Sequence, residues 1–198
     1  MKIKSVIKLC KRNRTAILYN QIDDNGEVVR QYIGDGASVF PLDGLPMLEA
    51  DNIPALFGIA GKDKPKWTIL QQLLPHEISV KDTEANEIVM ESTGLIVDFG
   101  GVKVGAMKAE GKTVWFDTAY TEPIDAMEGL FGIYLRKSKT GARYIVMKRG
   151  LELAGIALPF AGKMLGEKIR EVAATLTEPY EAEGDRVIGQ LEFEKEDE

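Results

Sequence analysis

The sequence predicts an α+β protein made of two pseudo-repeats, each an antiparallel β-meander followed by a short helix, with one longer helix near the C-terminus. Residues 36–59 return at 111–133 with a shift of 74 positions, so Asp43 matches Asp117 and the Leu-Phe-Gly-Ile of 56–59 matches that of 130–133. Each copy contains a short β-branched and aromatic run, at 38–40 and at 113–116, which is typical of strands. Apolar residues spaced three or four apart at 162–178 predict the longer helix.

Length and composition are those of a folded globular chain. The 198 residues are 44% hydrophobic and 28% charged, enough for one large domain or two small ones. No apolar run approaches the ~20 residues of a membrane span, and the first ten residues are too polar for a signal peptide. Cys10 is the only cysteine, so no internal disulfide forms. We therefore expect a cytoplasmic protein that does not enter a membrane.

The first repeat begins with three predicted strands after an alternating N-terminus. Lysine alternates with apolar residues at 3–9, which predicts a half-buried strand. The β-branched runs at 15–21 and 27–33 flank Asn25-Gly26, a strong hairpin signal because both residues tolerate positive φ. Val39-Phe40 follows as the third strand of the meander.

A short helix and a further apolar run complete the first repeat. Asn52 can cap a helix that has Pro54 in its first turn and ends at Gly61. Residues 69–74 fit either a buried strand or a short helix, which periodicity does not separate. The polar residues 76–92 are interpreted as a linker.

The second repeat follows the same plan. Strands are expected at 95–99, 102–107 and 113–116, then a helix from Thr121 to Phe131 and a strand at 143–148. We therefore expect the chain to divide into a first repeat, a linker, a second repeat with its closing helix, and an acidic tail or edge strand, at residues 1–75, 76–92, 93–180 and 181–198.

Charge is unevenly distributed within a net charge of −6. Residues 2–14 carry lysine and arginine but no acid, whereas residues 181–198 are strongly acidic. Opposite charge at the two ends fits a basic arm for nucleic acid and an acidic tail that competes for it. Two solvated terminal segments are the alternative interpretation.

Two basic loops form the candidate nucleic-acid site. No acid occurs from Gly129 to Gly150, and basic side chains interleaved with tyrosine could follow phosphates and stack on bases. The corresponding loop of the first repeat is also basic and precedes Trp67. A solvated hairpin with core aromatics is the other interpretation. The candidate residues are Arg136, Lys137, Lys139, Arg143, Tyr144, Lys148, Arg149, Lys62, Lys64 and Lys66.

Catalytic chemistry finds little support in the sequence, and no catalytic residue, metal or cofactor is predicted. Asp98, Glu110 and Lys112 have the residue types of a metal-dependent nuclease, but turn composition also explains them. Asp43 and Asp117 could be paired carboxylates, but an Asp after a strand more often bonds its own turn. A single His76 and a single Cys10 exclude a Cys/His zinc site within one chain.

The tail contains a short motif with two interpretations. Gln190-Leu191-x-Phe193 resembles the peptides with which bacterial replication proteins dock on the sliding clamp. Alternating apolar residues from Val187 to Phe193 also fit an edge strand.

Three segments carry a resemblance to a group of proteins. Ile33-Gly34-Asp35-Gly36, residues 41–46 (Pro-Leu-Asp-Gly-Leu-Pro) and Tyr144-Ile145-Val146 resemble uncharacterised proteins encoded in prophages of Gram-positive bacteria. The resemblance implies a bacteriophage gene expressed in the cytoplasm of a bacterial host, and it gives no residue a role.

These observations favour a non-enzymatic binding module that engages nucleic acid, or a phage or host replication protein, through the basic hairpin. One alternative is a virion or assembly protein that self-associates as a homo-oligomer through exposed edges. The other is the metal-dependent nuclease, which requires Asp98, Glu110 and Lys112 to converge.

Overall fold

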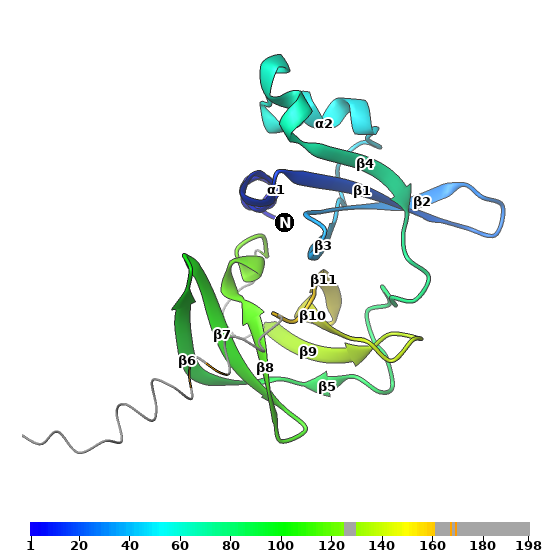
Figure 1. Ribbon diagram of the computed structural model, residues 1–198. Coiled ribbons are helices and arrows are strands. Elements are labelled where there is room, and N and C mark those ends of the chain that lie inside the picture. Colours follow the sequence, from blue (N-terminus) through cyan, green and yellow to red (C-terminus); the bar gives the residue numbers. More distant parts are fainter. Residues whose placement is uncertain (125–129, 161–166, 168, 170–198) are drawn as a thin grey trace, which may run out of the picture. The chain divides into compact units, whose positions relative to one another are not determined.

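An eight-stranded sheet forms the centre of the fold in the computed structural model, which describes residues 1–124, 130–160, 167 and 169 (Figure 1). The chain is mixed α+β, with many strands and few helices among these residues. The strands lie in the order β4 (Thr68–Leu73), β1 (Thr15–Ile22), β2 (Val28–Gly34), β3 (Ser38–Pro41), β11 (Glu152–Ala157), β10 (Arg143–Arg149), β9 (Phe131–Lys137) and β5 (Ile88–Val89).

Pairing within this sheet joins strands that the sequence assigned to different repeats. β1 and β4 are parallel, and every other neighbouring pair is antiparallel. Val39 of β3 pairs with Ile156 of β11. Strands from both ends of the described chain therefore share one sheet.

A smaller sheet and several short helices complete the architecture. The three-stranded sheet has the order β6 (Glu91–Phe99), β7 (Val102–Ala109) and β8 (Lys112–Asp117). The helical elements are α1 (Ile3–Asn13), the 3₁₀ helix η1 (Ala50–Asn52), α2 (Ile53–Phe57), η2 (Gly61–Lys66) and η3 (Thr118–Thr121).

The N-terminal segment is helix α1, so the strand predicted at residues 3–9 is wrong. The lysines alternate with apolar residues, but the side chains that become buried are Val6, Leu9 and Cys10, with Ile3 and Ile7 packed beside them. Spacings of three and four put these residues on one face of a helix. Burial of that stripe against the sheet outweighs the alternation.

The eight-stranded sheet is buried on both faces near its middle. Successive residues of a strand point to opposite sides, so neighbouring residues belong to different cores. On β1, Leu18 joins the core beneath α1 and α2, whereas Tyr19 joins a second core on the other face. On β10, Met147 likewise belongs to the first core and Val146 to the second. Both faces therefore need a covering segment.

Residues 74–80 cover the second face. Leu74, Ile78 and Val80 pack against the second core, although the sequence led us to interpret residues 76–92 as a polar linker. These residues belong to a longer segment, residues 74–87, which is called the strap here and runs from the end of β4 towards β5. The strap is thus part of the packed structure.

Most of the predicted meander strands are confirmed. The short helix after Asn52 is confirmed as α2, but its predicted end at Gly61 is wrong, because the helix ends at Phe57 with Gly58 in the left-handed conformation. Residues 69–74 take the strand alternative, as β4. The two Leu-Phe-Gly-Ile segments differ in structure, since Phe57 ends α2 while Phe131 begins β9. The internal duplication stays a prediction. The helix predicted from Thr121 to Phe131 lies partly outside the described residues, and its predicted end is wrong because Phe131 begins β9. The helix predicted at 162–178 lies almost wholly outside the described residues, and the tail at 181–198 completely.

Candidate functional site

Two residues of the predicted basic hairpin are buried. Arg136 on β9 is 1% exposed and Lys148 on β10 is 2% exposed, so neither side chain can reach a phosphate in this structure. Tyr144 is buried as well. The sequence treated these residues as surface groups, but they lie on the strand face that the strap covers.

Glu87 of the strap binds both buried cations. The Arg136 guanidinium donates from Nε at 2.9 Å and from Nη2 at 2.6 Å to Glu87 Oε2, and Lys148 Nζ pairs with Glu87 Oε1. Burial alone raises the pKa of Glu87, but hydrogen bonds from Lys148 and Arg136 outweigh it and hold that pKa below 4.5. The three side chains form an ion triad with a structural role.

The ion triad also fixes the strap backbone. Arg136 donates to the carbonyl oxygens of Lys81 at 2.7 Å and Asp82 at 3.1 Å. The Ser79 N–H donates to the Tyr144 hydroxyl at 3.2 Å. These residues therefore hold the strap on the sheet and are not available as a binding surface.

The remaining basic residues of the hairpin are at the surface. Lys137 and Lys139 are exposed, and the described chain gives neither an acidic partner. Arg143 pairs with Glu110 at 3.3 Å, and Arg149 pairs with an acid three residues later at 3.1 Å. The hairpin thus offers fewer available cations than its composition suggested.

A second basic surface forms where α1 meets η2. A cavity of about 300 Å³ lies between them and is lined by Lys11 and Arg14 from the end of α1 and by Lys66 and Trp67 from η2 and its C-cap. The Thr68 N–H donates to the Arg14 carbonyl at 2.9 Å, which fixes the two segments side by side. The sequence showed both basic segments but not that they adjoin.

Few acids neutralise this surface, called the α1–η2 face here. Lys66 pairs with Asp63 at 2.8 Å, the only acid among the described residues that line the cavity. Across the described residues, an acidic partner is absent for Lys4, Lys11, Arg14, Lys62 and Lys64, all of which are exposed. The α1–η2 face therefore carries a local positive charge on an acidic protein.

Trp67 adds an aromatic surface to the cavity. Its ring is half-buried and meets Phe57 edge-on, with the ring centroids 6.1 Å apart. Since Phe57 is buried in the core, this contact fixes the orientation of the indole. The cavity thus combines cations with a positioned aromatic ring.

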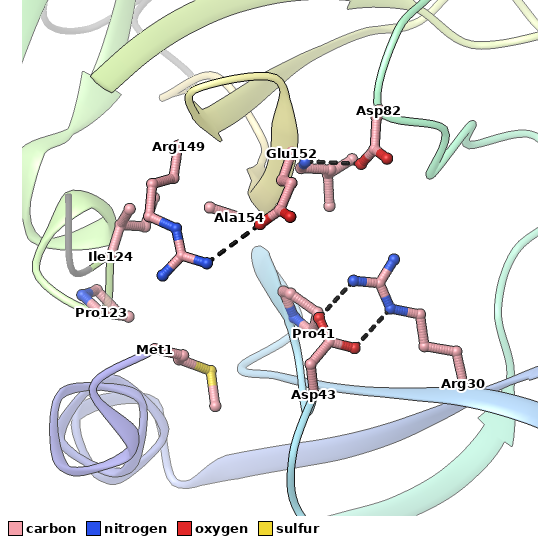
Figure 2. Close-up of a pocket in the computed structure, with 11 residues that line it drawn as sticks. Met1, Arg30, Pro41, Asp43, Asp82, Pro123, Ile124, Arg149, Glu152 and Ala154 are labelled. Atoms are coloured by element: carbon pink, nitrogen blue, oxygen red, sulfur yellow. Dashed lines mark hydrogen bonds and ion pairs between the residues drawn. The ribbon is translucent and has the colours of Figure 1, made fainter. Parts of the chain in front are cut away.

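A third surface feature is a polar cavity of about 350 Å³ lined from several elements (Figure 2). Arg30 donates from Nε to Asp43 at 2.8 Å and pairs with it again through Nη2, while Arg149 pairs with Glu152 at 3.1 Å. The bond from Arg30 lowers the pKa of Asp43. Because each arginine of the cavity already has a carboxylate partner, the cavity has no strong preference for an anion.

The predicted nuclease residues do not converge. Asp98 lies one residue before the end of β6, beside the start of β7, and accepts a bond from the Gly101 N–H at 2.9 Å. Glu110 lies in the turn at the far end of β7, whose eight residues span about 25 Å, and Lys112 begins β8 just after that turn. The turn interpretation is correct, and these residues cannot hold one metal ion.

Asp43 and Asp117 have separate partners and do not form a carboxylate pair. Asp43 binds Arg30, as described above. Asp117 accepts a bond from the Ala119 N–H at 2.9 Å, which caps η3, and pairs with Arg12 of α1 at 2.6 Å. Asp117 therefore anchors α1 next to the three-stranded sheet.

No protein-family model, curated protein or solved structure matches this chain. Within the described residues, no helix is long and apolar enough to span a membrane. The functional argument therefore rests on the surfaces described above.

Proposed function

We propose that the protein is a non-enzymatic binding module that holds a single-stranded nucleic acid on its α1–η2 face. The observation that carries the proposal is the cavity that Lys11, Arg14 and Lys66 line together with Trp67. Lysine and arginine neutralise backbone phosphates, and an aromatic face accepts any base by stacking. The cavity supplies both kinds of contact.

The site differs from the hairpin that the sequence favoured. Lys66 is retained in the proposal because it lines the cavity with Lys11 and Arg14, and Lys62 and Lys64 are retained because they are exposed residues of the same helix, η2. Arg136, Tyr144 and Lys148 are removed from it, because the strap covers them. Lys137 and Lys139 remain exposed and serve as the comparison surface.

The overall charge makes this proposal specific to one surface. At a net charge of −6, the protein as a whole repels a polyanion. Binding must then come from a local cluster of cations, and it must weaken steeply as salt rises because each neutralised phosphate releases counterions.

The test is a fluorescence-anisotropy titration of labelled single-stranded oligonucleotides at low and near-physiological salt. A Lys11→Ala/Arg14→Ala/Lys64→Ala variant should lose binding and should reduce the salt dependence. A matched variant, Lys137→Ala/Lys139→Ala/Arg143→Ala, removes the same charge from the hairpin and should bind almost as tightly as the wild type. Equal losses in the two variants would show a general charge effect and contradict the proposal.

Trp67 gives a second readout that does not depend on charge. The chain has two tryptophans, so Trp115→Phe leaves Trp67 as the only indole. Stacking of a base on Trp67 should quench its fluorescence as the oligonucleotide binds. Binding with unchanged Trp67 emission would place the nucleic acid elsewhere.

The biological setting remains a prediction from the sequence. The prophage resemblance suggests a bacteriophage context, and the tail motif at Gln190–Phe193, which lies outside the described residues, suggests a replication protein as partner. A sliding-clamp pull-down with and without residues 187–198 separates that hypothesis from direct nucleic-acid binding.

A further inference from the structure

The outer edge of β4 is an open strand edge. β4 is the first strand of the eight-stranded sheet and pairs with β1 on one side only. Thr68 donates to Arg14 and Leu74 donates to Asn20, each at 2.9 Å. Because successive N–H groups of a strand alternate in direction, the N–H groups of Ile69, Gln71 and Leu73 point away from β1. No described residue bonds to these three outward groups.

The other strand edges in the described chain carry features that block pairing. β5 has only two residues. β6 has an irregular register between Ser92 and Ile96, with Gly94 at φ 75°, and it carries Glu91 and Asp98. β8 carries Lys112 and Asp117, and the Trp115 carbonyl accepts a bond from the Phe160 N–H at 2.7 Å. Charges, bulges and covering segments are the usual protections of a sheet edge.

β4 has neither the charges nor the bulges, and η1, whose Ala50 N–H donates to the Gln71 side-chain oxygen at 3.0 Å, leaves the outward N–H groups of the strand unbonded within the described chain. Its six residues, Thr-Ile-Leu-Gln-Gln-Leu, contain no charge, no proline and no glycine, and its register with β1 is regular. Leu70 is 45% exposed and Leu73 is 58% exposed. An uncharged and regular edge with exposed leucines is a template for another strand.

We propose that β4 pairs antiparallel with β4 of a second copy of this chain, forming a two-fold symmetric dimer with a continuous sheet. A two-fold axis through Gln71 sets Ile69 opposite Leu73 of the second copy and Gln71 opposite its own counterpart. In that register every outward N–H faces an outward carbonyl, and the apolar side chains of Ile69 and Leu73 meet across the interface.

Charge at the two ends of β4 favours a second copy as the occupant. Lys64 and Lys66 precede the strand, Asp63 pairs with Lys66 at 2.8 Å, and Glu77 follows the strand. Lys64 therefore leaves the leading end of β4 with a net positive charge. An antiparallel arrangement brings the basic end of one copy to the acidic end of the other. A parallel arrangement would set lysines against lysines. The strand is thus complementary to itself in the antiparallel direction.

Sedimentation equilibrium tests the proposal without any nucleic acid, so its result is independent of the proposed function. The wild type should associate reversibly to a dimer. Leu73→Pro removes one outward N–H but no bond to β1, and proline is tolerated in an edge strand, so the variant should fold and its dissociation constant should rise at least about tenfold. Leu73→Ala keeps the N–H and should lose less.

A second variant covers the case in which Leu73→Pro fails to fold. Leu70→Lys keeps every backbone group and sets two lysines diagonally across the two-fold axis, about 7–8 Å apart, so it should also weaken the dimer. A monomeric wild type, or variants Leu73→Pro and Leu70→Lys that dimerise as strongly as the wild type, would overturn the proposal.

Amide hydrogen exchange resolved by residue gives the sharpest outcome. The N–H groups of Ile69, Gln71 and Leu73 should become protected only as protein concentration rises, while those of Leu70 and Gln72 stay protected throughout by β1. Protection of the outward groups at every concentration would show that they are bonded within one chain, and it would equally overturn the proposal.

Discussion

Glu87 is the residue on which two buried cations depend. Its carboxylate is 15% exposed and binds Arg136 and Lys148, for which the described chain offers no other acid. Removing one partner of a buried ion pair leaves an uncompensated charge, which costs about 3–5 kcal/mol. We expect Glu87→Gln to lower the free energy of unfolding by about 3 kcal/mol in a urea titration.

The control for this prediction is an ion pair at the surface. Glu152 pairs with Arg149 at 3.1 Å, and both side chains are largely exposed. Exposed pairs contribute about 0–1 kcal/mol, so Glu152→Gln should leave the urea midpoint almost unchanged. Similar effects of the two substitutions would mean that the ion triad does not stabilise the strap.

The same carboxylate makes stability depend on pH. Although burial opposes it, hydrogen bonds from Lys148 and Arg136 hold the pKa of Glu87 below its ordinary value of 4.5 in the folded protein. The folded state thus binds the proton less tightly than the unfolded state, so this stabilisation is complete above pH 4.5 and is lost as pH falls through the folded-state pKa. The stability difference between wild type and Glu87→Gln should shrink on acidification, as measured by urea titrations at several pH values.

At the element scale, the turn from β2 to β3 depends on Gly34. A Cβ at this position would lie 1.8 Å from the Ser38 carbonyl oxygen, and Asp35 fixes that turn by accepting bonds from the Ala37 and Ser38 N–H groups. The backbone would have to move, so Gly34→Ala should cost about 3 kcal/mol or more. Thermal unfolding measures the loss.

Gly61 is the matched glycine for that experiment. A Cβ there meets nothing within 4 Å, and its φ lies outside the left-handed region. Gly61→Ala should therefore be neutral or slightly stabilising, because alanine restricts the unfolded chain. A large loss of thermal stability in Gly61→Ala as well would show that the loss in Gly34→Ala does not come from the steric conflict in the turn from β2 to β3.

Some elements could be predicted from the sequence because their signals are local. The Asn25-Gly26 hairpin and the strands at 102–107 and 143–148 follow from turn residues and alternation, and the structure has them. The apolar residues that form the buried stripe of α1 were also visible in the sequence at spacings of three and four, in the same segment as the alternating lysines. Lys148 lies on the same strand face as Tyr144 and Val146, so alternation could have indicated its burial.

Other features required contacts between residues far apart in the sequence. The burial of Arg136 depends on Glu87 and on strap carbonyls that lie some fifty residues earlier in the chain. The meeting of Arg14 with Lys66 and Trp67 depends on the parallel pairing of β1 with β4. No local pattern contains these pairings, so the α1–η2 face could not be predicted even though both of its basic segments were visible.

On the scale of the whole molecule, the two proposals are geometrically linked, because η2 leads directly into β4. In the proposed dimer, each Lys66 lies five residues from the two-fold axis at Gln71. The two lysines are therefore about 33 Å apart along the strands, at about 3.3 Å per residue. Two α1–η2 faces at this separation could hold one nucleic-acid strand together.

This arrangement predicts that affinity depends on the length of the strand only when the dimer forms. An oligonucleotide of about 4 nucleotides fills one face, whereas one of about 20 nucleotides can engage both, and linked sites gain about 10²–10⁴ in affinity. In anisotropy titrations the long strand should bind the wild type at least about 100-fold more tightly than the short one. Leu73→Pro should retain affinity for the short strand and lose most of the gain. An equal gain in affinity for the long strand in the wild type and in Leu73→Pro would contradict this prediction, because nucleic-acid binding would then not depend on β4 pairing.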